Sequence, residues 1–557
     1  MKIKILRKIL FILTALCLVI GTVSAQQNTI GLIQYDQGNQ EGYVLFAPLY
    51  SKVTYLIDKQ GRLVHSWESQ YFPKYSTFLL EDGSLLRTGG VDNPFFRNAP
   101  AAGGIIEKIG WDGIVQWSYI ISDSTQCQHH DIVPLANGNI LVNVWEAIDS
   151  LTAHVIYGRQ VEKLGSVIWS EKIIEIKPTG KNSAEIVWEW HLKDHLVQDI
   201  NPEFTGAWYG SIAENIGLLN INYVKSADPK NPSWIHMNAI DYNAERDQIM
   251  VSAHALGEIW IIDHSTSTKE AAQHTGGKYN KGGDFIYRWG NPAAYNRGTD
   301  EDRVLFGQHH SNWIRPGLPN EGKILLFNNG VGRPDGAYSS IEIIEPPVDL
   351  NGNYVLSETE PYGPENKYWY YTDPNPTNLY TTNQSGVQQL PNGNINVCVG
   401  TKGTFFEVTP NKEVVWKYIN PVTKDGIAVP GDKIDTGTGF NNVFRTYLYP
   451  ADYPGLSGKV LSTGFPLEIS LLGVDTSKII AYPNPAQDMI TFTWKGTATS
   501  PTNIVLSNAI GQIVIEQSVI SEEREYSMSL NNLLPGMYSL KVKDGNEIRV
   551  GKVMILR

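Results

Sequence analysis

Three histidines occupy the same position in an irregular internal repeat, directly before the first strand of a repeat unit. Two other units carry a tyrosine or a serine there, and the equivalent residues are Tyr75, His130, His236, His310 and Ser385. Imidazole, with an ordinary pKa of about 6.5, can act as nucleophile, base or acid at neutral pH. If the repeats surround an axis, these side chains meet at one end of a central channel. The alternative is a wet, polar channel in which the histidines only bind water.

One arginine follows a strand of this repeat closely. Arg333 comes directly after the turn 329–332, which ends the strand that His310 introduces. A guanidinium offers a planar fork of donors that matches the oxygens of sulfate or phosphate. We therefore expect Arg333 to hold an anion near the channel end, although an isolated arginine is more often a surface charge.

The first half of each repeat unit predicts a β-hairpin. Tyr75 is followed by STFLLEDGSLL, His130 by DIVPLANGNILV and Ser385 by GVQQLPNGNINV. Asp-Gly and Asn-Gly pairs between apolar runs favour tight turns, because both central positions need positive φ. The copies after His236 and His310 have longer turns.

The second half of each unit is another pair of strands that ends on a tryptophan. These ends are Trp67, Trp117, Trp188, Trp289, Trp369 and Trp416. The unit that ends at Trp67 lacks a first half, and the segment 443–450 has the β pattern to supply it. Joining strands from both ends of the chain closes a ring without an exposed edge. We expect an all-β fold, with a six-bladed β-propeller over 31–465; a solenoid would need capping units that the sequence lacks.

Both ends of the chain differ from the repeat. Residues 1–25 combine a basic start, a short apolar run and the small-residue pattern Val23-Ser24-Ala25, which predicts a secretory signal peptide. The apolar run is too short to span a bilayer, and no later segment predicts a membrane span. Residues 474–557 alternate strands with Gly and Pro turns, which predicts a small β-sandwich.

The composition narrows the possible partners. The formal net charge of −12 argues against nucleic acid, since phosphate backbones require clustered Lys and Arg. Outside the predicted signal, only Cys127 and Cys398 remain, and their spacing suggests no metal knuckle. Two small buried residues are the simplest interpretation, with a disulfide left open.

The tail resembles a known secretion domain. The Tyr482–Pro485 segment YPNP, the LPGMY turn at Leu534–Tyr538 and the final strand KVMIL are similar to the C-terminal sorting domain of the type IX secretion system. This resemblance implies a secreted or cell-surface protein of a Bacteroidetes-type bacterium, exported through the periplasm with the type IX secretion machinery as a partner. An accessory binding sandwich is the alternative.

The repeat region resembles another family. The segments Trp234–Asn238, Phe306–His310 and Phe327–Arg333 look like the corresponding stretches of bacterial aryl-sulfate sulfotransferases, as do Ile259–Ala271, Tyr287–Pro292 and Val187–Leu196. The resemblance implies a six-bladed propeller that moves a sulfuryl group from an aryl sulfate donor to a phenolic acceptor. It also implies a sulfated histidine and no adenylyl-sulfate donor or other cofactor.

Matching the motifs places the family's functional residues on this chain. His236, His309 and Arg333 are the implied catalytic positions, although the repeat alignment favours His310 over His309. The repeat positions and the matched segments together give the expected substrate-binding residues Tyr75, His130, Asn238, His310, Asn329 and Ser385.

This chain departs from the family pattern in one respect. The family's sulfated histidine belongs to a later blade, but no histidine follows His310, and the late repeat has Ser385 instead. Either the motif lies elsewhere, or an earlier histidine such as His130 replaces it, or the reaction has changed. A non-catalytic propeller that binds a glycan, peptide or phenolic ligand is therefore the alternative function. A quinone-dependent dehydrogenase is a third possible function, but this sequence lacks the vicinal disulfide and the acidic calcium cluster expected of that class.

Two further motifs carry weaker signals. His191 and His195 have a spacing that could seat zinc on a helix, but the glutamate of zinc proteases is missing, so a surface helix is favoured. The glycine-rich segment 274–283 suggests a phosphate loop, but lacks the strand–loop–helix context and predicts a flexible excursion. The sequence therefore predicts no metal site.

Overall fold

The computed structural model describes residues 29–556, except 98, 100, 226–227, 429–431, 433, 435–439, 463–465, 472–478, 495–500, 509–512, 520–524 and 545–546. Two compact units emerge, one spanning Asn28–Ser470 and the other containing Leu471–Arg557. The signal peptide expected at 1–25 lies outside the described residues.

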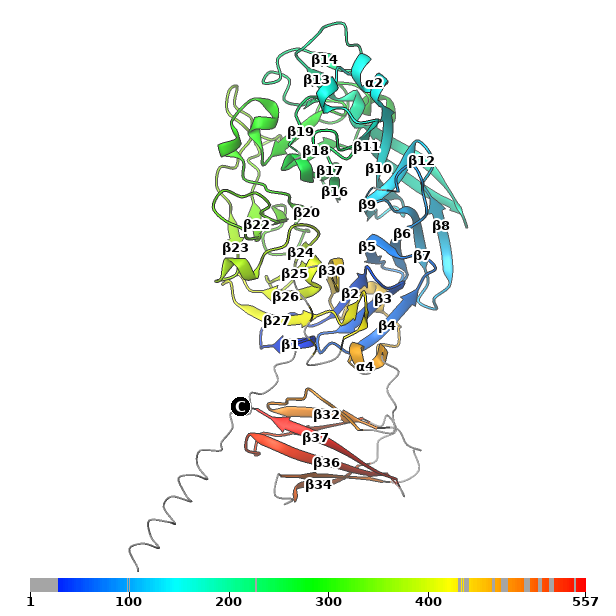
Figure 1. The fold of residues 1–557 in the computed structure, drawn as a ribbon, viewed down its shortest axis with the longest axis vertical. Coiled ribbons are helices and arrows are strands. Elements are labelled where there is room, and N and C mark those ends of the chain that lie inside the picture. Colours follow the sequence, from blue (N-terminus) through cyan, green and yellow to red (C-terminus); the bar gives the residue numbers. More distant parts are fainter. Residues whose placement is uncertain are drawn as a thin grey trace, which may run out of the picture. The chain divides into compact units, whose positions relative to one another are not determined.

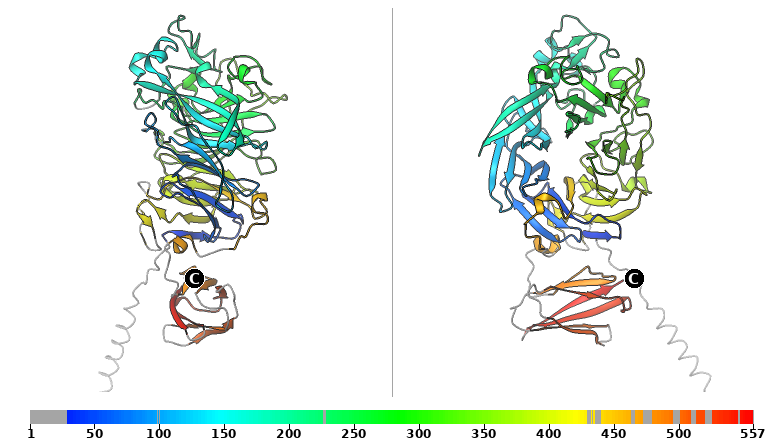
Figure 2. Two further views of the ribbon diagram at one scale, coloured as in Figure 1. Left: turned by 90° about the vertical axis from the view of Figure 1, so that its right-hand side faces the viewer. Right: turned by 180° about the vertical axis from the view of Figure 1, so that it is seen from behind.

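The larger unit is a β-propeller, in which antiparallel sheets follow one another around a common centre (Figures 1 and 2). Its described residues form six sheets of four or five strands. We call these sheets blades, and four of them are continuous in sequence. The first two contain β5 (Pro73–Leu79), β6 (Leu85–Gly90), β7 (Gly104–Ile109) and β8 (Val115–Ile120), and then β9 (Gln126–Pro134), β10 (Ile140–Asp149), β11 (Val167–Gly180) and β12 (Ser183–His191). The other two contain β16 (Met237–Asn243), β17 (Gln248–Ala253), β18 (Glu258–Asp263) and β19 (Phe285–Trp289), and then β20 (His309–Trp313), β21 (Ile324–Asn328), β22 (Ser340–Ile344) and β23 (Trp369–Tyr371).

The remaining two blades combine both ends of the unit. One contains β24 (Gly386–Gln389), β25 (Ile395–Val399), β26 (Thr404–Val408), β27 (Val414–Ile419) and β1 (Gly31–Tyr35). The other contains β30 (Val443–Tyr449), β2 (Tyr43–Pro48), β3 (Val53–Asp58) and β4 (Leu63–Glu68). The pairing of β30 with β2 confirms that the segment at 443–450 supplies the strand missing from the first repeat. The addition of β1 to the edge of β27 was not predicted.

The repeat explains which strands are central and which are peripheral. The strands β5, β9, β16, β20, β24 and β30 lie nearest the centre of the ring (Figure 1). The tryptophans that end the repeat all lie in the fourth strands: β4, β8, β12, β19, β23 and β27. Apolar residues on both faces of the intervening strands are buried, because each sheet packs against its two neighbours.

A belt of polar contacts joins the innermost strands around the ring. At five junctions, a side chain of one blade accepts a hydrogen bond from a backbone N–H of the next. These bonds are Ile240 to Asp131 (3.1 Å), Trp313 to Asp241 (2.7 Å), Val387 to His310 (3.0 Å), Leu448 to Gln388 (2.8 Å) and Leu79 to Tyr449 (2.9 Å). At the sixth, the Ser76 hydroxyl donates to the carbonyl oxygen of His130 over 3.2 Å.

Shorter elements decorate the propeller. The helices α2 (Ser150–Val155) and α3 (Thr268–Ala271) lie between strands, and α4 (Leu467–Leu471) follows the last blade. The excursion between β12 and β16 forms a small parallel sheet, with β14 (Trp208–Tyr209), β13 (Leu196–Gln198) and β15 (Leu219–Asn220). A two-stranded ribbon joins β28 (Val422–Thr423) to β29 (Gly426–Ile427). His191 ends β12 and a single helical turn, Leu192–Asp194, precedes His195, so the surface helix expected there is wrong.

The smaller unit is a β-sandwich. One sheet contains β31 (Ile480–Tyr482), β32 (Met489–Thr493) and β35 (Glu525–Ser529). The other contains β34 (Ile513–Val519), β33 (Thr502–Ser507), β36 (Gly536–Asp544) and β37 (Glu547–Ile555). Its core includes Phe492, Leu506 and Leu540, all fully buried. Among the described residues of the chain, no helix has the length and apolar character needed to cross a membrane.

Both remaining cysteines are buried, and neither forms a disulfide. Burial raises the pKa of the Cys127 thiol to about 11. These thiols are therefore small core residues rather than reactive groups.

Ring closure makes a testable contribution to stability. Arg445 of β30 and Asp131 of β9 form a buried ion pair of 2.7 Å, so Arg445→Ala leaves a buried carboxylate without its cation. We expect the free energy of unfolding in denaturant to fall by about 3–5 kcal/mol. In the exposed pair Arg97–Asp92, Arg97→Ala should cost less than about 1 kcal/mol. Equal losses in the two variants would contradict a central role of the buried pair.

Candidate functional site

The repeat-equivalent residues share an unusual backbone conformation. Tyr75, His130, His236, His310 and Ser385 have positive φ values of 93°, 49°, 59°, 49° and 94°. Non-glycine residues rarely adopt this region. In four of these blades the pairing of the innermost strand also shifts register near this position, which marks a β-bulge. A bulge re-aims side chains, and here it does so at the same place in each of these blades.

Five histidines form a chain of neighbouring rings, which we call the histidine cluster. Its members, in spatial order, are His129, His130, His236, His254 and His309. The ring centroids of successive members lie 5.2, 4.5, 5.0 and 4.9 Å apart. The sequence predicted three of these residues. It missed His129, which is adjacent to His130, and His254, whose backbone N–H bonds the carbonyl of His236.

His236 has one engaged ring nitrogen and one open one. Its Nδ1 lies 3.1 Å from the hydroxyl of Ser233. Among the described residues, nothing forms a hydrogen bond with its Nε2. The side chain is half-buried, so this nitrogen can meet a molecule that enters the site.

A carboxylate and two histidines form a relay beside it. Nδ1 of His130 lies 2.9 Å from Nδ1 of His129, and Nε2 of His129 lies 2.9 Å from Glu171. The second contact is close but poorly aligned for a hydrogen bond. Because the neighbouring Glu171 oxygen can only accept, we assign a hydrogen to Nε2 of His129, so that its Nδ1 accepts the Nδ1–H of His130. Nε2 of His130 then carries a lone pair.

His309 is held at both nitrogens. Its Nδ1 donates to the side-chain oxygen of Asn329 over 2.7 Å, and its Nε2 accepts the backbone N–H of Gln384 over 3.0 Å. The Asn329 amide in turn donates to the carbonyls of Thr381 and Gln384. The ring is therefore fixed in one tautomer, with no lone pair left for a substrate.

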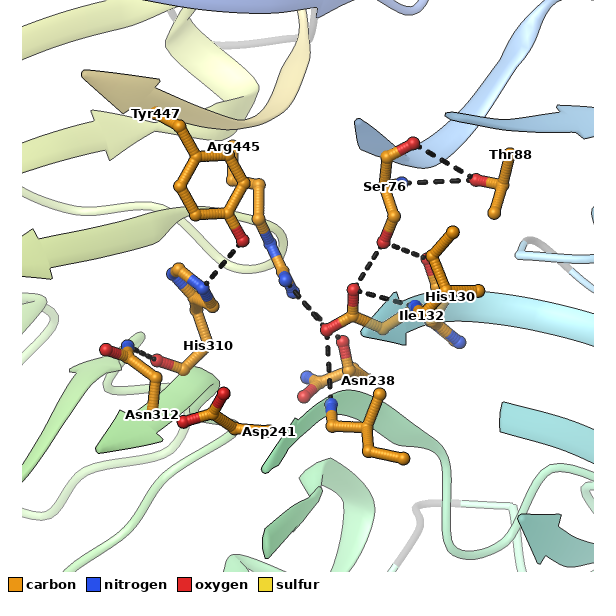
Figure 3. A network of polar contacts seen from close by, with 12 residues as sticks. Ser76, Thr88, His130, Ile132, Asn238, Asp241, His310, Asn312, Arg445 and Tyr447 are labelled. Carbon is orange, nitrogen blue, oxygen red and sulfur yellow. Dashed lines mark hydrogen bonds and ion pairs between the residues drawn. The ribbon is translucent and has the colours of Figure 1, made fainter. Parts of the chain in front are cut away.

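Three other expected site residues have structural contacts. His310 accepts the Val387 N–H at Nδ1, so its Nε2–H donates to the Tyr447 hydroxyl over 3.2 Å (Figure 3). The Ser385 hydroxyl accepts the N–H of Gly400. Asn238 donates to the carbonyl of Gln308, and its own carbonyl accepts a hydrogen bond from Arg445.

Burial keeps four rings of the cluster uncharged. Burial lowers the pKa of His236 to about 3, and repulsion from His309 and His129 adds to this shift. Burial likewise lowers the pKa of His309 to about 4. The pKa values of His130 and His254 fall well below the ordinary value for the same reason, with further contributions from neighbouring histidines. At neutral pH these four rings are neutral, with lone pairs rather than positive charges.

Arg333, the arginine expected at the site, contacts neighbouring side chains of its own blade. Arg333 donates to Tyr338 (3.2 Å) and to Ser340 on β22 (3.0 Å), and within the described residues no contact joins it to the histidine cluster. The buried cation at the centre is Arg445, bound to Asp131 (Figure 3). Arg445 also lowers the pKa of His309, after the larger effect of burial. The sequence signal for Arg445 was its place in the closing strand.

An aromatic surface borders the cluster. The rings of Tyr75 and Phe444 lie 4.4 Å apart, and Tyr75 lies 5.5 Å from His130. The Phe444 ring lies 6.4 Å from both His130 and His309. Of this pair, Phe444 is buried and Tyr75 is partly exposed.

Comparison with protein families identifies the larger unit. The family model described as Arylsulfotransferase (ASST) matches residues 34–429. The chain belongs to the arylsulfotransferase family. A curated relative, the arylsulfate sulfotransferase AssT of Lelliottia amnigena, is 23% identical over 278 residues, which cover 44% of this chain and 41% of that protein. The matched region thus spans less than half the length of this relative.

Solved structures with similar chains are distant. A protein of unknown function from Bacteroides caccae is 11% identical and covers 73% of this chain and 98% of its own, with a TM-score of 0.36. The Cps50 (Swd1) β-propeller domain of Myceliophteria thermophila is 8% identical and covers 70% and 89%, with a TM-score of 0.33.

The smaller unit matches a secretion domain. A model described as a secretion system C-terminal sorting domain covers residues 480–556. This domain belongs to type IX secretion, and it indicates a secreted or cell-surface arylsulfotransferase-family protein.

The neutral cluster predicts a pH dependence of stability. Because the pKa of folded His236 is about 3 and that of an unfolded histidine about 6.5, the unfolded chain binds the extra proton. Stability conferred by this group is present above pH 6.5 and is lost as the pH falls toward 3. His236→Asn should therefore reduce the slope of unfolding free energy between about pH 6 and 4 by up to about 1.4 kcal/mol per pH unit. Asn tolerates the positive φ of this position.

The control for this experiment is His154→Asn on helix α2, outside the cluster. This variant should keep the slope of the original protein. A slope that is unchanged in His236→Asn would mean that His236 titrates normally in the folded protein.

Proposed function

We propose that this chain transfers a sulfuryl group from an aryl sulfate to a phenol, with Nε2 of His236 as the nucleophile. The observation that supports this assignment most is the pattern of nitrogen partners: His309 and His310 use both nitrogens within the fold, whereas Nε2 of His236 is open. A hydrogen on Nδ1, donated to Ser233, leaves the lone pair on Nε2. The low pKa of His236 keeps that lone pair unprotonated.

The first step exchanges an oxygen–sulfur bond for a nitrogen–sulfur bond. The lone pair of His236 Nε2 attacks sulfur, and the electron pair of the broken bond leaves with the phenolate oxygen. This yields a sulfated histidine and a phenolate, as in other two-step transfers through a covalent intermediate. In the second step the oxygen of an acceptor phenol attacks sulfur, and the electron pair of the nitrogen–sulfur bond returns to the imidazole.

The relay of Glu171, His129 and His130 takes the proton from the acceptor phenol. Nε2 of His130 accepts the proton of the acceptor phenol, while its Nδ1–H is shared with His129, which lies against the Glu171 carboxylate. The carboxylate stabilises positive charge as it develops on the imidazoles. In the reverse direction the same nitrogen protonates a poor leaving phenolate. Glu171 is itself oriented by the N–H of Met237 over 2.9 Å.

Other groups are suited to binding the donor. The partly exposed ring of Tyr75, packed on the buried ring of Phe444, offers an aryl group a stacking surface. Nε2 of His254 is buried and has no hydrogen-bond partner in the described part of the chain, so it is a candidate donor to a sulfuryl oxygen. Nε of Arg333 is likewise buried without a hydrogen-bond partner among the described residues, and the anion-holding role of Arg333 stays a prediction.

The absence of a late-blade histidine fits this assignment. Gln384 and Ser385 stand at the corresponding repeat position, and the N–H of Gln384 binds His309. That blade contributes a backbone donor instead of an imidazole. We infer that His236 takes the nucleophilic role, which leaves the reaction class of the family unchanged.

The main test follows nitrophenolate release from 4-nitrophenyl sulfate, with and without a second phenol. We expect nitrophenolate release that depends on the acceptor. When the reaction is quenched without acid, mass spectrometry should find a sulfuryl group on the peptide that contains His236. His236→Asn should abolish both signals, and His154→Asn should retain them. A folded protein with no release for any of a panel of phenols would favour the non-catalytic binding alternative.

His130→Asn separates nucleophile from base. With 4-nitrophenyl sulfate this variant should still release one nitrophenolate per enzyme in a burst, because nitrophenolate leaves without protonation. Its steady-state turnover with a phenol acceptor should fall by about 10²–10⁴-fold. Loss of the burst together with turnover would instead assign the attack to His130.

The pKa of His236 predicts the acid limb of the rate profile. With a pKa of about 3, the nucleophile stays neutral at pH 5, and kcat/KM for 4-nitrophenyl sulfate should change less than about twofold between pH 7.5 and 5. A histidine with an ordinary pKa would lose about 30-fold over this interval. Rates measured in buffers of constant ionic strength distinguish the two cases.

A further inference from the structure

Two sequence motifs without a role in sulfuryl transfer meet at one place. His195 follows the helical turn after the β9–β12 blade and directly precedes β13, while His274 and Asp284 flank the glycine-rich segment before β19. The i, i+4 spacing of His191 and His195 was considered for zinc and not favoured, and His191 contacts Glu146. The cluster therefore combines residues from separate parts of the chain.

The three side chains converge on one oxygen. Oδ1 of Asp284 lies 2.8 Å from Nδ1 of His195 and 2.8 Å from Nδ1 of His274. All three ligand atoms lie within 4.8 Å of one another. Two imidazoles and one carboxylate are the donor set of many divalent transition-metal sites.

The tautomer of His195 makes the geometry informative. Its Nε2 lies 2.8 Å from the carbonyl oxygen of Ala271, which accepts but cannot donate, so Nε2 carries a hydrogen. The other nitrogen, Nδ1, lies 2.8 Å from Oδ1 of Asp284, so it faces the carboxylate of the cluster. A ring N–H donated to a backbone carbonyl is also the usual support of a metal-binding histidine.

We propose that His195, His274 and Asp284 bind a divalent metal ion of the zinc class. His195 is fully buried and stacks on Trp190 at a centroid distance of 5.5 Å, which fixes the ring. The His274 side chain is 38% exposed, so this side of the site is open to solvent, and water supplies the remaining coordination. The bound ion ties the glycine-rich segment to β13.

The local backbone is built for close approach at this point. A Cβ atom at Gly283 would collide with the carbonyl of Ala271 and lie 2.5 Å from Nε2 of His195. Only glycine permits this packing, which explains part of the glycine-rich pattern. The segment thus serves to bring His274 and Asp284 to His195 rather than to bind phosphate.

A second histidine in the same blade provides a matched control. His264 lies between two carboxylates, with Nδ1 2.7 Å from Asp247 and Nε2 3.1 Å from Glu175. Each nitrogen faces its own acid, an arrangement that suits an imidazolium. These bonds, against the opposing effect of burial, raise the pKa of His264 to about 9. His195 lacks such a second acid, because its other nitrogen faces a carbonyl.

The experiment uses the full chain without a polyhistidine tag, stripped with EDTA and supplied with zinc sulfate. We expect about one zinc ion per chain after gel filtration, and an increase in Tm that EDTA reverses. Cobalt substitution should give the visible absorption of a nitrogen–oxygen site. His274→Gln and Asp284→Asn should each weaken zinc binding by at least about tenfold, while His264→Gln should leave it unchanged.

Two results would overturn the proposal. One is a folded, EDTA-stripped chain that takes up no zinc and shows no change in Tm. The other is zinc binding that survives in His274→Gln and Asp284→Asn but disappears in His236→Asn, which would place the ion at the histidine cluster. Both readouts are independent of sulfuryl transfer, so failure of the enzyme assay does not affect them.

Discussion

The propeller depends on one carboxylate at its centre. Asp131 of β9 binds the guanidinium of Arg445 on β30, the hydroxyl of Ser76 on β5 and the N–H of Ile240 on β16. A single side chain therefore joins four of the innermost strands, including the strand that closes the ring. Removing a carboxylate from water is costly, and the full set of donors at Asp131 offsets that cost. If β30 did not close the ring, Asp131 would be the buried group that loses its cation.

The same constraint positions the chemical groups. His130 precedes Asp131, so a bulge that aims the carboxylate toward the ring centre also fixes the neighbouring imidazole. The positive φ recurs at His236 and His310, which makes the backbone geometry a property of the repeat rather than of one blade. Because the fold buries these rings together, their pKa values fall and the imidazoles remain neutral. The burial that accompanies the packing of the ring thus also keeps these imidazoles neutral.

Local patterns in the sequence predicted much of this architecture. Asn-Gly and Asp-Gly turns, terminal tryptophans and an unmatched first unit were sufficient to predict the blades and the closing role of β30. They could not predict the partners of individual nitrogens. The contact of Arg445 with Asp131 spans 314 positions, and the lock on His309 comes from a backbone N–H of another blade. A sequence motif identifies His309, but only the fold shows that both of its nitrogens are engaged.

This distinction bears on how the reaction can vary within the ring. Equivalent positions of the blades surround one centre, so a group brought in by one blade can substitute for a group lost from another. What limits the exchange is the hydrogen-bond partner of each nitrogen. His310 shares the backbone conformation of His236, yet Val387 and Tyr447 occupy both of its nitrogens. His236 has only Ser233, and that single partner leaves it a lone pair to use. Hydrogen bonding thus removes His309 and His310 from the candidates that the repeat brings together, and the proposed assignment of His236 rests on its open Nε2.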